Sequence, residues 1–445
     1  MTKQRDFKTL VRERMAKTGE RYAAARARVL SETADRAHLS PPLRAAYPGV
    51  LDRYDVFGGI QSGTAPLTNA LRHAGIVWGP TGRPLTEPVV NGLCGGPGFL
   101  YAVFEYKGWP PLLSIALHSR SMPDAYIAQG LARLGVATMR HETTSPASAR
   151  KTLEATLGAG KPALCAAGLR TVAVVGRDGD DWWIDGRTAV PARVSSATLA
   201  RLRGSYRPAK NRLTTVDGAA ESADPIGTLR LAIADTAKSY TEPPVPRSFW
   251  LNCGFAGLEK WQRMLTDSND KKAWPALFEE GPRAFAGLKR TYEWVACLVS
   301  PGAGRPLYAE FLAEAARILK EPSLQTAAAA YREAGQLWSA FADSIATVDD
   351  PAVRRACEEA DREVESLDAE GDCRPMANPI DQMKEQREAG AACRLTKTAA
   401  RAIYAEMAVR LRAIGDAERA GVDAMAAIGG PDAAPPSRRG TRGRA

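Results

Sequence analysis

The sequence predicts an α+β fold, in which a mixed N-terminal domain with a short antiparallel sheet precedes an all-α C-terminal domain. Apolar and β-branched runs at 163–167, 171–175 and 182–185 predict strands, and the segment 176–180 has the glycine and aspartate content of a hairpin turn. Apolar residues spaced three and four apart over 324–345 predict a long helix. Short strands followed by helices alone are typical of an α+β chain.

Composition divides the chain into four parts. Residues 1–47 are a basic helical segment and a proline-containing linker, and residues 50–217 carry the mixed domain. The Asp224-Pro225 step opens a helical domain over 225–427. Residues 429–445 are rich in Pro, Ala, Arg and Gly, a composition that predicts disorder.

Further elements follow from local signals. Thr86-Glu87-Pro88 has the pattern of a helix start, and a glycine cluster follows over 92–98. Apolar runs predict strands at 99–106 and 112–117; helical patterns predict helices at 124–134, from Ser145-Pro146 to 158–160, at 352–368 and at 394–414.

The net charge of +10 is concentrated at the two ends of the chain. The first 30 residues carry nine Lys/Arg against three Asp/Glu, and residues 433–445 carry four Arg and no acid, which leaves the intervening body neutral. A neutral body argues against a broad nucleic-acid groove, because such a groove needs a basic face on the folded part. Any nucleic-acid contact is therefore confined to the basic ends.

The cysteine and histidine content indicates the cellular compartment of the protein and limits the metal chemistry expected of it. Seven cysteines without a CxxC pair, no secretory leader and no apolar run of 18 residues favour a cytoplasmic protein that does not enter the membrane. Four scattered histidines predict no metal site, and no phosphate-binding or dinucleotide motif predicts a cofactor.

Residues 61–75 carry the strongest chemical signal, because they read as a turn that enters a helix. Ser62 stands at the expected helix start, where unpaired backbone N–H groups stabilise negative charge. Acyl transfer from such a position also needs a histidine base and an orienting carboxylate or amide. Asp185, near the end of the predicted hairpin, is the candidate for the carboxylate.

These residues resemble a known family. The segment Ser62-Gly63-Thr64-Ala65-Pro66-Leu67 with Gly75 is similar to the Cys-Gly-x-Ala-x-Leu…Gly block of papain-like, C39-type cysteine peptidase folds. The order of later motifs resembles the N-terminal domain family of butirosin biosynthesis protein H and the helical domain of unknown function that follows it: Glu87 with 92–99, 160–163, 172–178 with 183–185, 254–261, 308–316, and Tyr331 with Trp338.

The resemblance implies a papain-like acyltransferase in natural-product biosynthesis. Such a protein moves an acyl group from an acyl carrier protein thioester to a small amine or peptide through a cysteine acyl-enzyme. The chain departs from this pattern twice, since Ser62 occupies the cysteine position and Arg170, followed by Thr171, occupies the position of the histidine. Neither Arg170 nor Thr171 can act as a neutral imidazole base.

A serine hydroxyl depends on its base more than a thiol does, so the chain is expected to be a weakly active or inactive member with degenerate catalytic residues. Two alternatives remain open at this point. The chain is a non-catalytic scaffold that binds a carrier protein or peptide, or it is an active serine acyltransferase in which His73, His118 or His141 reaches Ser62.

Other features have plainer interpretations. The glycine cluster at 92–98 favours tight packing over phosphate binding, and Cys94 within it favours a buried apolar role over that of a replacement thiol. Gly158 to Lys161 lacks the Walker pattern and predicts a helix end. Trp182 and Trp183 are expected to place one ring in the core and one outward.

Overall fold

The structure is a computed structural model. This structure describes residues 47–55, 57–109, 111–118, 123–168, 170–188, 190–219, 224–298, 301–370 and 379–426, with the isolated residues 11, 13–15, 25, 29 and 428. Most of the basic N-terminal segment, most of the linker and the tail at 429–445 therefore lie outside the described residues.

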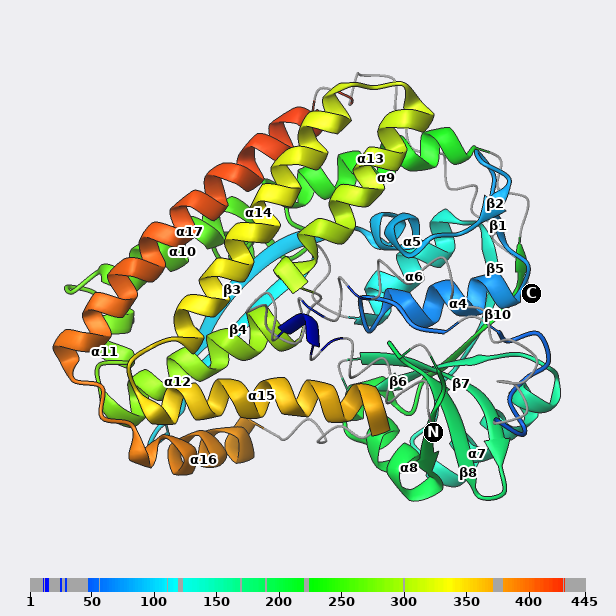
Figure 1. The fold of residues 1–445 in the computed structure, drawn as a ribbon, viewed down its shortest axis with the longest axis horizontal. Helices are drawn as coiled ribbons and strands as arrows, with labels where there is room; N and C mark the ends of the chain where they lie inside the picture. Colours follow the sequence, from blue (N-terminus) through cyan, green and yellow to red (C-terminus); the bar gives the residue numbers. More distant parts are fainter. Residues whose placement is uncertain are drawn as a thin grey trace, which may run out of the picture.

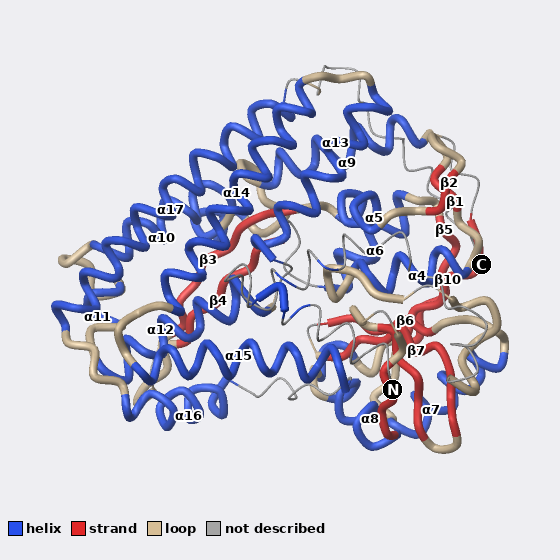
Figure 2. Tube along the Cα trace, in the orientation of Figure 1, coloured by secondary structure: helices blue, strands red, loops and turns tan. Residues whose placement is uncertain are grey.

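A six-stranded antiparallel sheet forms the centre of the N-terminal region (Figures 1 and 2). Its order is β5-β10-β6-β7-β8-β9. The strands of this sheet are β5 (Val136–His141), β6 (Ala163–Ala167), β7 (Arg170–Asp178), β8 (Asp181–Asp185), β9 (Ala192–Ser195) and β10 (Leu213–Ala219).

Helices cover both faces of this sheet. Strand β7 shows the division, because Ala173 and Val175 belong to the large core with α4 and α6, whereas Val172 and Val174 belong to a second core beneath α7 and α8. Successive residues of a strand point to opposite faces, so this division assigns each remaining residue of β7 to one of the two faces. The helices of this region are α4 (Thr64–His73), α5 (Glu87–Cys94), α6 (Pro123–Arg133), α7 (Pro146–Gly158) and α8 (Ser196–Gly204).

Helix α4 runs antiparallel to strand β6. The Nε2 atom of His73, the last residue of α4, lies 3.1 Å from the carbonyl oxygen of Gly160, just before β6 begins. The start of α4 therefore lies toward the turn that joins β6 to β7.

A second hairpin leaves the N-terminal region and packs among the C-terminal helices (Figure 1). Strands β3 (Pro97–Phe104) and β4 (Leu112–His118) pair antiparallel, and the Phe99 ring stacks on Trp261 with centroids 5.9 Å apart. The indole of Trp274 donates a hydrogen bond to the Tyr101 hydroxyl at 3.0 Å. A short hairpin, β1 (Val77–Trp78) with β2 (Arg83–Pro84), lies at the periphery.

Beyond β10, the described residues contain helices and no further named strand. The long helices α13, α14 and α17 lie side by side in Figure 1, with α15 and α16 along the lower edge. The helices are α9 (Pro225–Ser239), α10 (Gly254–Thr266), α11 (Trp274–Leu277), α12 (Gly281–Tyr292), α13 (Arg305–Leu319), α14 (Ser323–Ala346), α15 (Pro351–Glu370), α16 (Pro379–Ala389) and α17 (Lys397–Ala426). Short helical turns are η2 (Arg207–Ala209), η3 (Arg247–Asn252), η4 (Glu293–Cys297), η5 (Pro301–Gly304) and η6 (Gly390–Ala392).

A buried ion pair ties these helices to the β3–β4 hairpin. Arg305 and Glu418 are both fully buried, and the Nε atom of Arg305 donates to Oε1 of Glu418 at 2.7 Å. The same guanidinium donates to the carbonyl oxygens of Leu117 at 2.8 Å and Gly98 at 3.0 Å. Removing either partner would leave an uncompensated charge in the core.

The structure confirms an α+β chain with a helical C-terminal region and enlarges the predicted sheet. The apolar stripe at 324–345 lies in α14, and Asp224 caps α9 by accepting a hydrogen bond from the backbone N–H of Gly227. Strands β5, β9 and β10 and helix α16 are additional, because their sequences are short or polar and carry little periodic signal. None of the described helices combines the length and apolar content needed to cross a bilayer.

The prediction for the tryptophan pair was wrong in one respect. Trp182 and Trp183 are both buried, on opposite faces of the sheet. The segment before α4 covers the second ring, because the Trp183 indole donates to the Pro48 carbonyl at 2.7 Å and meets the Tyr47 ring edge-on at 5.4 Å. Sequence alternation could not reveal this cover, which comes from 135 residues away.

Candidate functional site

The start of helix α4 places Ser62 just before the first helical residue, Thr64. Ser62 is half-buried, and Gly63 is the residue that precedes the helix without a side-chain cap. Pro66 in the first turn has no N–H to satisfy, which suits this position. The helix start therefore presents backbone N–H groups close to a hydroxyl, as the sequence predicted.

Glu87, the first residue of α5, holds the loop that leads to Ser62. Its carboxylate accepts hydrogen bonds from the backbone N–H groups of Ile60 at 2.7 Å and Gln61 at 2.8 Å, and from the Thr64 hydroxyl at 3.0 Å. The Thr86-Glu87-Pro88 pattern predicted only a helix start. The structure shows that the acidic residue of this pattern also fixes the conformation of the candidate site.

The histidine that contacts a neighbour of Ser62 is His118, at the end of β4. Its Nε2 atom lies 3.3 Å from the Gln61 side-chain nitrogen, and the Gln61 oxygen accepts from the Asn91 amide at 2.5 Å. This network assigns Nε2 as the unprotonated, accepting nitrogen. Burial, with the Arg305 charge as a second cause, lowers the pKa of His118 to about 4, so the ring is neutral near pH 7.

The other two described histidines lie away from Ser62. His73 ends α4, about 14 Å along the helix axis from its first residue. His141 alternates along β5 with Arg140, which faces α6, so His141 faces the opposite side of the sheet. His38 lies outside the described residues. Among the described histidines, only His118 contacts a neighbour of Ser62.

Asp185 is fully buried beside α4, but its hydrogen bonds go to Tyr54 and Asn69. The Oδ2 atom accepts from the Tyr54 hydroxyl at 2.6 Å and from the Asn69 amide at 2.9 Å. Burial raises the pKa of Asp185 to about 7, although both hydrogen bonds oppose the rise. Asn69 lies about 8 Å along the helix axis from Thr64. The carboxylate therefore supports the helix interior and orients no imidazole among the described residues.

Arg170 and Thr171 lie on opposite faces of β7. Thr171 shares the face of Ala173 and Asp185, which α4 covers, and is 7% exposed. Arg170 alternates with Val172 and Val174 on the other face. Burial raises the pKa of the Cys297 thiol and the Arg170 charge opposes that rise, so Arg170 lies toward the helical region.

This geometry separates the residues predicted for the site. Ser62 and Asp185 both adjoin α4 but at different levels, and the strand position that faces α4 at the β6–β7 end belongs to Thr171. The side chains that bond to the side chains of Asp185 and Gln61 come from 30 to 131 positions away, and no sequence spacing connects them.

Arg187 is a further residue near the site that the sequence did not single out. Its side chain is 7% exposed, and Nη1 lies 3.5 Å from the carbonyl oxygen of Ile60, two residues before Ser62. The Arg187 guanidinium therefore lies beside the loop that leads to Ser62. The available signal was its position two residues after Asp185.

Cys94 and the glycine cluster serve packing. Burial raises the pKa of the Cys94 thiol to about 12, so it stays protonated and is no replacement nucleophile. A Cβ atom at Gly92 would lie 2.3 Å from the Phe311 ring, and one at Gly96 would lie 2.4 Å from the Tyr308 ring. The cluster thus lets α13 approach closely. No group of three or more His, Cys, Asp or Glu side chains in the described ranges is arranged to hold a metal ion.

Comparisons with known families agree with this two-part architecture. Residues 61–172 match the family described as butirosin biosynthesis protein H, N-terminal. Residues 197–371 match a domain of unknown function, DUF4872. The chain therefore carries a region similar to butirosin-H N-terminal domains, followed by a region similar to DUF4872 domains. No curated protein matches the chain.

The extent of the butirosin-H match bears on the site. It includes Ser62, Glu87, His118 and the start of β7, and it ends at residue 172, before Asp185. The DUF4872 match begins in α8 and continues to the end of α15. The helices that carry Arg305 and pack on the β3–β4 hairpin thus belong to the second matched domain.

Proposed function

We propose that this chain is a butirosin-H-type protein on a papain-like acyltransferase scaffold whose catalytic residues are degenerate, and that it binds an acyl-bearing or peptide ligand without transferring the acyl group. One observation carries the proposal: among the described residues, no imidazole bridges Ser62 and Asp185. The proposed setting is acyl, thioester or peptide-related specialised metabolism, with a carrier protein or a small amine as partner.

The physical case begins with Ser62. Near neutral pH its hydroxyl needs a base within hydrogen-bond reach to become a nucleophile. The neutral ring of His118 uses Nε2 to accept from Gln61, and the low pKa of His118 makes it a weak proton acceptor. Loss of a nucleophile together with its base lowers the catalytic rate constant on the order of a million-fold.

The scaffold nevertheless keeps the features of a binding site. Glu87 holds the Ser62 loop in one conformation, and the backbone N–H groups at the start of α4 favour a dipolar group such as a carbonyl nearby. These groups bind without proton transfer. A ligand with a carbonyl end fits such a site.

The test uses a stable mimic and a reactive donor of the same acyl group. A thioether analogue of an acyl pantetheine is expected to bind saturably, whereas the matching thioester is expected to leave the intact mass of the protein unchanged. An acyl adduct that maps to Ser62 and disappears in Ser62→Ala would contradict the proposal. Absence of any saturable binding would contradict the scaffold role.

The contact between Gln61 and His118 favours a second candidate function, a serine acyltransferase with a relocated base. In that case ligand binding must draw Gln61 away so that Nε2 of His118 faces the Ser62 hydroxyl. Hydrolysis of an activated ester would then fall equally in Ser62→Ala and His118→Gln. An ester-hydrolysis rate unaffected by either substitution excludes this candidate.

A further inference from the structure

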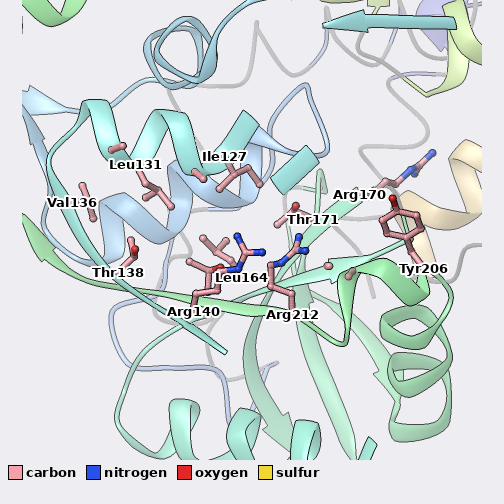
Figure 3. A pocket seen from close by; sticks show the side chains of 16 residues that line it. Ile127, Leu131, Val136, Thr138, Arg140, Leu164, Arg170, Thr171, Tyr206 and Arg212 are labelled. Carbon is pink, nitrogen blue, oxygen red and sulfur yellow. The ribbon is translucent and has the colours of Figure 1, made fainter. Parts of the chain in front are cut away.

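A cavity of about 260 Å³ lies between helix α6 and the sheet (Figure 3), and its described lining includes neither Ser62 nor Asp185. The lining residues of β5, β6 and β10 share one face of the sheet, because Thr214 of β10 pairs with Arg140 of β5 on one side and with Leu164 of β6 on the other. Helix α6 closes the other side with Ile127 and Leu131. Neither the butirosin-H match nor the proposed function assigns a role to this space.

The inner part of the cavity is apolar. Ile127 and Leu131 from α6 face Val136 and Leu164 from the sheet, and all four side chains are buried. Such a surface removes apolar ligand atoms from water, which stabilises binding more with each CH₂ group that is buried. An apolar tail therefore suits this end.

The sheet side of the cavity also carries positive charge. Arg140 and Arg212 line the cavity together, whereas the side chain of Arg170, at the start of β7, points away from them in Figure 3. The described lining contains no aspartate or glutamate. Figure 3 shows the guanidinium groups of Arg140 and Arg212 close together below α6. The Nε atoms of both donate to the same oxygen of Glu142, at 2.8 Å and 3.1 Å, so two positive charges share one carboxylate oxygen.

Glu142 fixes the position of this pair. The two arginines lower the pKa of the Glu142 carboxyl, so it stays ionised and keeps both side chains in place. Arg140 is 48% exposed and Arg212 is 13% exposed, which sets the pair between solvent and the apolar interior. A guanidinium prefers carboxylate or phosphate partners, and the planar carboxylate matches its fork of donors.

The volume limits the ligand. A methylene group fills roughly the space of a water molecule, about 30 Å³, so the cavity holds roughly eight such groups. We propose that this cavity binds a small monocarboxylate with an apolar tail of about five or six carbon atoms, with its carboxylate at Arg140 and Arg212 and its tail against Leu131 and Leu164.

Calorimetric titration of the full chain with hexanoate tests the proposal, with hexan-1-ol as the uncharged probe of the same length. Hexanoate is expected to bind at one site and much more tightly than the alcohol. Arg212→Gln is expected to weaken hexanoate binding roughly tenfold or more, since hydrogen bonds to charged groups contribute about 1.5–3 kcal/mol. Arg355→Gln, which removes an exposed arginine of α15, is the matched control and is expected to bind as the parent does.

A second variant tests whether the ligand occupies the cavity. Ala166→Leu extends a side chain from β6 into the cavity and is expected to reduce hexanoate binding while leaving the far-UV circular dichroism unchanged. Equal binding of hexanoate by the parent and Arg212→Gln, equal affinity for the alcohol, or no saturable binding by the parent would overturn the proposal. The titration contains no acyl donor, so its failure and a failure of the Ser62 proposal are separate results.

Discussion

Replacing Asp185 by asparagine is expected to stabilise the protein at alkaline pH. The carboxyl group is fully buried, and its pKa is raised from 3.8 to about 7 because burial disfavours the charged form. Asparagine keeps an oxygen that accepts from Tyr54 and Asn69 but carries no charge. The substitution therefore removes the ionisation cost and preserves these two hydrogen bonds.

The sign and size of this effect follow from proton linkage. Between pH 4 and pH 7 the unfolded chain has lost the Asp185 proton and the folded protein still holds it, so stability falls as pH rises, by about 1.4 kcal/mol per pH unit. Above pH 7 both states are ionised and the loss is complete. From pH 5 to pH 8 the parent is thus expected to lose about 3 kcal/mol through this group.

Urea unfolding at pH 5 and pH 8, followed by tryptophan fluorescence, measures this difference. The free energy of unfolding of Asp185→Asn relative to the parent is expected to rise by about 3 kcal/mol between the two pH values. Asp416→Asn removes an exposed carboxylate of α17 and is the matched control, for which no comparable rise is expected. A relative stability of Asp185→Asn that stays constant or falls with pH would refute the reasoning.

Three further predictions concern packing. Gly96→Ala and Gly82→Ala place alanine at nearly the same positive φ, 62° and 63°, but only the Cβ at position 96 meets a tyrosine ring. Thermal unfolding is expected to show a loss of about 1–2 kcal/mol in the free energy of unfolding for Gly82→Ala, and a loss about 1–3 kcal/mol larger for Gly96→Ala. Arg305→Met leaves Glu418 buried without its cation, so chemical denaturation is expected to reveal a loss of about 3–5 kcal/mol. Cys94 is expected to resist alkylation at pH 8 until urea unfolds the chain, as mapped by peptide mass spectrometry. Each prediction has its own contradicting result: equal losses of stability for the two glycine variants, no loss of stability for Arg305→Met, or alkylation of Cys94 in the folded protein.

Much of the fold was predictable from local sequence patterns. The three- and four-residue apolar spacing gave α14, and the glycine–aspartate turn gave the β7–β8 hairpin, because these signals come from neighbouring residues. Strand β5 has one buried residue followed by exposed ones, so it carries no alternation to detect. The edge strands of the sheet therefore became apparent only from their pairing with β10 and β8.

The helix start beside Ser62 was predictable from the sequence, whereas the contacts around it were not. Ser62 at a helix start follows from the sequence, since a turn next to a helical pattern is a local feature. The bond from Tyr54 to Asp185 spans 131 positions, and the Gln61–His118 contact spans 57. The faces of Arg170 and Thr171 depend on which helices cover β7, which only the assembled cores reveal.

Restoring the missing chemistry tests the central claim most directly. The double variant Ser62→Cys, Thr171→His returns a thiol to the helix start and an imidazole to the strand face that α4 covers, whereas Ser62→Cys, Arg170→His puts the imidazole on the opposite face. After incubation with an acyl thioester, intact mass spectrometry is expected to detect an acyl adduct on the first variant and none on the second or the parent. An adduct on the parent, or equal acylation of the two double variants, would contradict the account.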